Sequence, residues 1–134
     1  MAAETLSRAF ELAGREIDAL DASVAHAGLP LDEAIARAIA IAKRLMAAYI
    51  AAAGKKMPHE DDDVLDVFRV LVKGDPSWHT LRDNLRELVY YRNCIALGRS
   101  DALPPLPDTM TVRTVRHLYL LIKTRCLREG RVPG

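Results

Sequence analysis

The sequence contains few cysteines and few aromatic residues. Its 134 residues include two cysteines, and aromatic residues make up 5% of the chain. Two cysteines are too few for a disulfide framework or a zinc site, so we expect Cys94 and Cys126 to be reduced thiols in the core. Half of the chain is hydrophobic. A core of Ala, Leu, Ile and Val with few aromatics favours helix packing over a β-sheet.

The chain also lacks an excess of either charge and a long apolar run. There are 19 basic and 18 acidic residues, which gives no general attraction to nucleic acid or membranes. Arg37, Lys43 and Arg44 interrupt the apolar stretch 34–53, leaving an uncharged run of 45–54. A membrane span needs about 20 apolar residues, and the first residues do not resemble a signal peptide. We therefore expect a cytoplasmic protein that does not enter the membrane.

The spacing of apolar residues predicts helices along the whole chain. A first helix over about 3–26, closed by Gly28, is predicted by a stripe at steps of three and four: Leu6, Phe10, Ala13, Ile17, Leu20 and Val24. Pro30 suits the first turn of a second helix that ends at Gly54. A short third helix follows the acidic run 60–63 and ends at Gly74.

A fourth helix is predicted over about 77–97, opened by Asp75 and Pro76 and ended by Gly98. The proline-rich segment 99–108 predicts a loop, and Thr109 or Thr111 can cap a last helix that reaches Gly130. We therefore predict an all-α fold, with residues 1–134 forming one domain. Its architecture is an up-and-down four-helix bundle with an additional short helix.

Arg92 occupies an unusual place in the fourth helix. Its apolar stripe runs through Leu81, Leu85 and Leu88, and the next steps reach Arg92 and Ile95. The spacing therefore places a guanidinium on the packed face, where an unpaired charge is costly. We expect Arg92 to meet a carboxylate, backbone carbonyls, a subunit interface or an anionic ligand. Of the neighbouring tyrosines at 90 and 91, at least one should face outward, as a dimer interface would require.

The end of this helix resembles a motif of the HEPN superfamily. The match consists of Arg92, Asn93, Ile95, Ala96 and Gly98, followed by a proline-containing loop and a final helix. The resemblance implies a small helical bundle that forms a homodimer. It also implies a place in a bacterial defence or toxin–antitoxin system, with an antitoxin or a minimal nucleotidyltransferase as partner. Members with the full motif are metal-independent ribonucleases, in which an arginine and a histidine act on RNA.

Leu97 stands where the family motif has its histidine. Leucine cannot exchange a proton, and general acid–base catalysis contributes about 100- to 10,000-fold. Arg92 and Asn93 retain the ability to bind a phosphate, because a guanidinium fork suits that geometry. We therefore expect a degenerate motif without a catalytic residue and without a cofactor. His79 lies about 27 Å along the helix from Leu97 and cannot replace the missing group, whereas His117 on the last helix remains a candidate.

Three hypotheses remain open. The first is a HEPN-like homodimer that acts as a nucleotide- or RNA-binding or assembly module. The second is a divergent or inactivated copy of a HEPN endoribonuclease toxin. The third is a structural helical adaptor with no role in nucleic-acid binding.

Two charged segments have simple structural interpretations. The acidic run 60–63 is consecutive rather than convergent, so it suits the positive end of a helix better than a metal site. From residue 111 onward, six basic residues stand against one acidic residue. This excess predicts either the solvated face of the last helix or an RNA-binding surface that contains Arg113, Arg116, Lys123 and Arg125.

Overall fold

The computed structural model describes residues 2–133, and side chains from residue 5 onward. Within this range the chain is all-helical, as predicted, and has no strand. Five α-helices and one 3-10 turn follow one another as α1 (Ala2–His26), α2 (Leu31–Ala52), α3 (Val64–Val72), α4 (His79–Ala96), η1 (Ser100–Ala102) and α5 (Pro107–Arg128).

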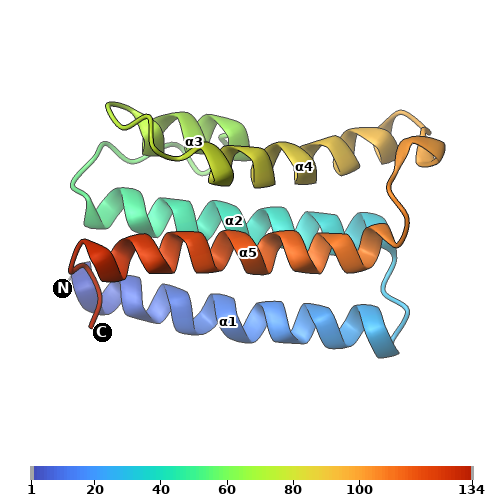
Figure 1. Cartoon of the computed structure of the whole chain (residues 1–134), viewed down its shortest axis with the longest axis horizontal. Coiled ribbons are helices and arrows are strands. Elements are labelled where there is room, and N and C mark those ends of the chain that lie inside the picture. The colour runs from blue at the N-terminus through green and yellow to red at the C-terminus, as the bar shows by residue number, and fades with distance from the viewer. Residues whose placement is uncertain (1, 134) are drawn as a thin grey trace.

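The four long helices lie side by side, and successive ones run in opposite directions (Figure 1). Helices α2 and α5 contact each other, and each also contacts α1 and α4. Helices α1 and α4 do not contact each other, so α2 and α5 form the central pair. Short α3 packs on α2 and α4. The arrangement agrees with the predicted up-and-down bundle plus one short helix.

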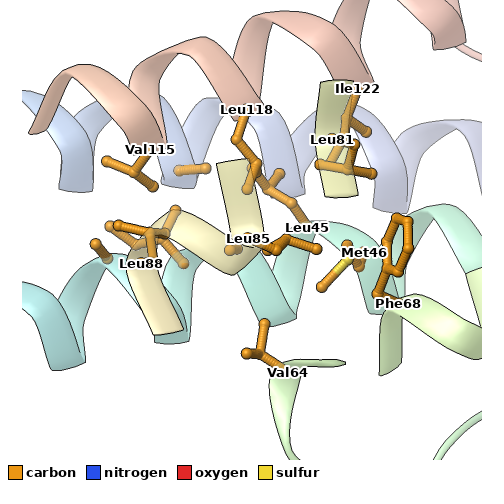
Figure 2. Close-up of a cluster of buried hydrophobic side chains, with 14 of the residues drawn as sticks. Leu45, Met46, Val64, Phe68, Leu81, Leu85, Leu88, Val115, Leu118 and Ile122 are labelled. Atoms are coloured by element: carbon orange, nitrogen blue, oxygen red, sulfur yellow. The ribbon is translucent and has the colours of Figure 1, made fainter. Parts of the chain in front are cut away.

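Apolar side chains from every long helix meet in the centre of the bundle. Figure 2 shows part of this core, where α2, α3, α4 and α5 contribute Leu45, Met46, Val64, Phe68, Leu81, Leu85, Leu88, Val115, Leu118 and Ile122. Burying each leucine or isoleucine side chain stabilises the fold by about 1.5–3 kcal/mol. The stripe predicted for α1 is buried from Leu6 to Leu20. With its 9 residues, α3 is too short to be stable alone, so its four buried side chains hold it in place.

The start of α5 differs from the prediction. The helix begins at Pro107, which occupies a first-turn position, so neither Thr109 nor Thr111 is its cap. Thr111 is buried, and its hydroxyl donates to the carbonyl of Pro107 at 2.8 Å. The reason is that a first-turn proline has no unsatisfied N–H and has a φ already suited to a helix. The predicted loop 99–108 is shortened further by η1.

Helix α5 therefore begins earlier than predicted, whereas two other helices begin later. Helix α4 begins at His79, two residues after the predicted start, because Asp75 folds the preceding turn. The carboxylate of Asp75 accepts hydrogen bonds from the backbone N–H and the hydroxyl of Ser77. Pro30 is the cap of α2 rather than a residue of its first turn.

Further observations concern buried side chains and membrane spans. Trp78 is 5% exposed and meets the ring of Tyr49 edge-on, with ring centroids 5.3 Å apart. Cys94 and Cys126 are both buried free thiols, as predicted, and burial raises the pKa of Cys126 to about 11. Among residues 2–133, no helix has the length and hydropathy that a bilayer crossing requires.

Candidate functional site at the end of helix α4

Helix α4 ends in a tight backbone cap at Gly98. The N–H of Arg99 bonds to the carbonyl of Cys94 at 2.7 Å, and that of Gly98 to the carbonyl of Ile95 at 3.1 Å. This pair of bonds is the Schellman motif, which requires a left-handed residue at its turn. Gly98 has a φ of 67°, which costs glycine little. The motif glycine therefore ends the helix directly after Leu97, as predicted.

Arg92 is held by a carboxylate from another helix. Its Nη1 and Nη2 atoms donate to the two carboxylate oxygens of Asp63, at 2.8 and 3.3 Å. Asp63 is the cap residue at the start of α3. Hydrogen bonds from Arg92 are the largest cause of the lowered pKa of Asp63, and the same bonds raise the pKa of the guanidinium. Of the four predicted kinds of partner, the structure supplies a carboxylate.

The prediction that Arg92 lies on the packed face is only partly correct. Its side chain is 39% exposed, so it lies at the edge of that face. Tyr91 takes the buried position and is 1% exposed. A step of three from Leu88 reaches Tyr91, and a step of four reaches Arg92. The 3.6-residue period allows both steps, and spacing alone does not choose between them.

The other two motif positions face solvent. The side chain of Leu97 is 76% exposed, the largest exposure among the bulky apolar residues of the described chain. Asn93 is exposed, and its amide has no hydrogen-bond partner among residues 2–133. Its backbone carbonyl accepts the N–H of Leu97 at 2.9 Å. The predicted site residues thus lie on one helix end, with Arg92 bound to Asp63 and the other two open to solvent.

Three of the four histidines of the chain lie away from this helix end, and the fourth, His59, lies in the loop that leads to Asp63, four positions before it. Asn84 binds His117, with Nδ2 and Nδ1 separated by 3.3 Å. Asn84 precedes Leu97 by 13 positions, which is about 20 Å along the helix axis. His79 opens α4 at its far end. His26 ends α1, a helix that does not contact α4.

The segment that follows α4 is tied back to it. Tyr90 is 49% exposed, and its hydroxyl donates to the carbonyl of Ala102 in η1 at 2.9 Å. Tyr91 points inward and bonds to Glu87, so one tyrosine of the pair faces outward, as predicted. At the far end of the segment, Leu106 is 69% exposed and has a φ of 52°. A leucine in the left-handed region is unusual and strained.

The acidic run 60–63 contributes structural contacts. Asp62 accepts the backbone N–H of His59 at 3.0 Å, and Asp63 holds Arg92. In the part of the chain that the structure describes, no three His, Cys, Asp or Glu side chains converge as a metal site would require. Asp63 is the residue that sequence reasoning missed, because no spacing rule links a cap of α3 to the last turns of α4.

The predicted basic surface on α5 is divided by contacts within the chain. Arg116 pairs with Asp18 and Asp21 of α1, at 3.0 and 3.2 Å. Lys123 lies 3.4 Å from the hydroxyl of Tyr119, and Arg125 is paired and nearly buried. Arg113 is exposed and has no partner among the described residues. Of the four predicted cations, only Arg113 faces solvent without a contact.

The sequence and the structure were compared with family models, curated proteins and solved structures, and nothing matches. The HEPN resemblance therefore remains a hypothesis that rests on residues 92–98.

Proposed function

We propose that the protein is a HEPN-like assembly module whose ribonuclease motif is degenerate, and that it pairs with a second copy through the end of α4. The observation that carries this proposal is Leu97. It occupies the position of the family's histidine, and its side chain is 76% exposed at the helix end. An exposed leucine has no role in proton transfer, whereas it suits a contact that excludes water.

The contacts of Arg92 support a structural role for the motif. A catalytic arginine must be free to meet the charge that develops on a phosphate. Here both terminal nitrogens of Arg92 are bound to Asp63. A phosphate of a nucleotide or RNA would have to displace that carboxylate. The ion pair thus favours assembly over catalysis and makes ligand binding by Arg92 dependent on opening the pair.

Exposed apolar side chains favour a second copy as the partner. Leu97 and Leu106 bracket the segment after α4, and Tyr90 on the last turns of the helix contacts that segment through Ala102. The cores of subunit interfaces are enriched in aromatic and other apolar residues. A homodimer brings two copies of one surface together, so an apolar surface suits it without any charge complementarity.

The wider setting follows from the family resemblance alone. We place the module in the cytoplasm of a bacterium, in a defence or toxin–antitoxin system. An antitoxin or a minimal nucleotidyltransferase would be its further partner. The ribonuclease alternative is not favoured, because Leu97 replaces the histidine of the motif and both terminal nitrogens of Arg92 are bound to Asp63.

A cleavage assay tests the motif. We expect the unaltered protein not to cut single-stranded RNA in the presence of EDTA, and we expect Leu97→His to create cleavage at least about 100-fold above it. Adding Arg92→Ala should abolish that gain. Leu127→His is the matched control, since Leu127 is also exposed and lies at the far end of the bundle. Cleavage by the unaltered protein that survives Arg92→Ala would contradict the proposal. A Leu97→His protein that stays silent even when Asp63→Asn frees Arg92 from its partner would remove the family assignment.

A further inference from the structure

A groove of about 330 Å³ lies between the start of α4 and the second half of α5. Its lining includes Ser77, Trp78 and Thr80, so it lies at the opposite end of α4 from Leu97. Trp78, Leu120 and Leu121 are among its apolar walls. Its polar lining consists of Ser77, Thr80, His117, Thr124, Arg125 and Arg128.

The charged groups that line this groove are all basic. Arg125 and Arg128 contribute two guanidinium groups, and no carboxylate is part of the lining. Arg128 is exposed and has no partner among residues 2–133. The arrangement favours an anion, because a groove with low-dielectric walls and one sign of charge concentrates the opposite charge.

Arg125 is fixed in position before any ligand arrives. Its side chain is 15% exposed, and its guanidinium lies 3.9 Å from the centre of the Trp78 ring. It donates to Asp75 at 2.9 Å and to the hydroxyl of Ser77 at 2.8 Å. A second carboxylate, that of Glu129, lies 3.9 Å from the guanidinium of Arg125. Neither Asp75 nor Glu129 lines the groove. A cation held in this way loses little conformational freedom when it binds a ligand.

His117 adds an imidazole that Asn84 contacts through one ring nitrogen. The amide nitrogen of Asn84 lies 3.3 Å from Nδ1 of the imidazole, and Asn84 is itself 8% exposed. Asn84 engages Nδ1, and the other ring nitrogen, Nε2, has no partner within the described chain. Thr80 and Thr124 add two hydroxyls that have no partner within the described chain. The groove thus presents hydrogen-bonding groups beside the unpaired guanidinium of Arg128 and the guanidinium of Arg125, which Asp75 pairs from outside the lining.

We propose that this groove binds a small phosphate monoester. Arg128 and the Nε2 atom of His117 would hold the phosphate oxygens, and the apolar wall of Leu120 and Leu121 would contact the organic group. A phosphate monoester dianion carries negative charge and several oxygens that accept hydrogen bonds. These oxygens match the hydrogen-bond donors and cations of the lining. The volume is at the lower end of the range for small-molecule sites, so the organic group is compact. This site is independent of the proposed assembly surface.

The test uses the full chain and its single tryptophan. Because Trp78 lines the groove, its fluorescence reports on occupancy, and calorimetry gives the stoichiometry. Inorganic phosphate and adenosine monophosphate are the probes. Adenosine and acetate at matched ionic strength are the ligand controls. Arg128→Gln removes one guanidinium of the groove, and Arg113→Gln is the matched control, an exposed arginine of the same helix outside the groove.

We expect both phosphate probes to bind saturably, one per chain, and adenosine and acetate not to bind. Arg128→Gln should weaken binding about tenfold, the usual effect of losing a hydrogen bond to a charged group. Arg113→Gln should change the affinity less than about twofold, because Arg113 lies outside the groove and salt screens an exposed charge that is remote from the ligand. His117→Phe, at an exposed position, should weaken binding while leaving the helical circular dichroism intact. Absence of saturation below about 10 mM, or equal losses in the two arginine variants, would overturn the proposal.

Discussion

The ion pair between Arg92 and Asp63 fastens the motif helix to the start of α3, and a double-mutant cycle measures its strength. The two variants are Asp63→Asn, which keeps the shape of the side chain, and Arg92→Met, which keeps its apolar stem. The coupling free energy is the part of the double variant's effect that the two single variants do not explain. Chemical unfolding with urea gives each free energy of unfolding.

The exposure of the pair sets the expected magnitude. The side chains of Arg92 and Asp63 are 39% and 44% exposed, so water and salt screen their attraction. Exposed pairs contribute about 0.2–1 kcal/mol, and the two parallel hydrogen bonds place this pair near the upper end. We expect a coupling of about 0.5–1 kcal/mol at pH 7 and low salt. The Arg37–Glu33 pair within α2, with 48% and 50% exposure, is the matched control, and we expect about 0.3–0.5 kcal/mol for it.

The pH dependence gives a second test of the same pair. The pKa of Asp63 is lowered in the folded protein, chiefly by hydrogen bonds from Arg92. Its contribution to stability is therefore fully present above the unfolded-state pKa of about 4 and is lost as the pH falls through the lower folded-state pKa. A coupling near zero at pH 7, or one that persists in full after the carboxyl group is protonated, would refute the reasoning.

Two further predictions concern the cap of α4 and a buried tyrosine. Gly98→Ala should lower the free energy of unfolding by about 1–2 kcal/mol, because φ is 67° and alanine is strained in the left-handed region. No atom crowds the new methyl group, so the backbone strain is the whole effect. Gly14→Ala, inside α1, should instead stabilise the protein by about 0.5–1 kcal/mol in the same urea experiment. Burial and a hydrogen bond to Glu129 raise the pKa of Tyr49 to about 12, so its contribution to stability should hold below about pH 10 and decline as the pH rises toward 12. Urea unfolding of Tyr49→Phe between pH 8 and 11.5 should show a shallower decline, and an identical decline would contradict this assignment.

The sequence predicts the helices well where one apolar stripe and one glycine define them. The stripe of α1 and the glycine after Leu97 are examples, because helical periodicity and left-handed backbone are local properties. The start of α5 is predicted less well. Pro107 and Thr111 both satisfy local rules for a helix start, and only the neighbouring fold decides between them.

In the candidate sites, the sequence identifies single residues but not the partners that the fold brings near them. The sequence identifies Arg92 as a residue that needs a partner, but Asp63 lies 29 positions away and only the packing of α3 on α4 brings it near. Arg128 and His117 also meet α4 only through tertiary packing, so the groove that they line has no local signal in the sequence. Conversely, Arg116 and Arg125 look like one basic surface in sequence, whereas opposite charges on other segments divide them.

Sedimentation velocity tests the central claim most directly, namely that the end of α4 is an assembly surface. The samples are the unaltered chain and Leu97→Asp, with Leu127→Asp as a control for an exposed leucine at the other end of the bundle. We predict a dimer for the unaltered chain and for Leu127→Asp, and a monomer for Leu97→Asp. An unaltered chain that stays monomeric at every concentration, or a Leu97→Asp protein that still dimerises, would contradict the account.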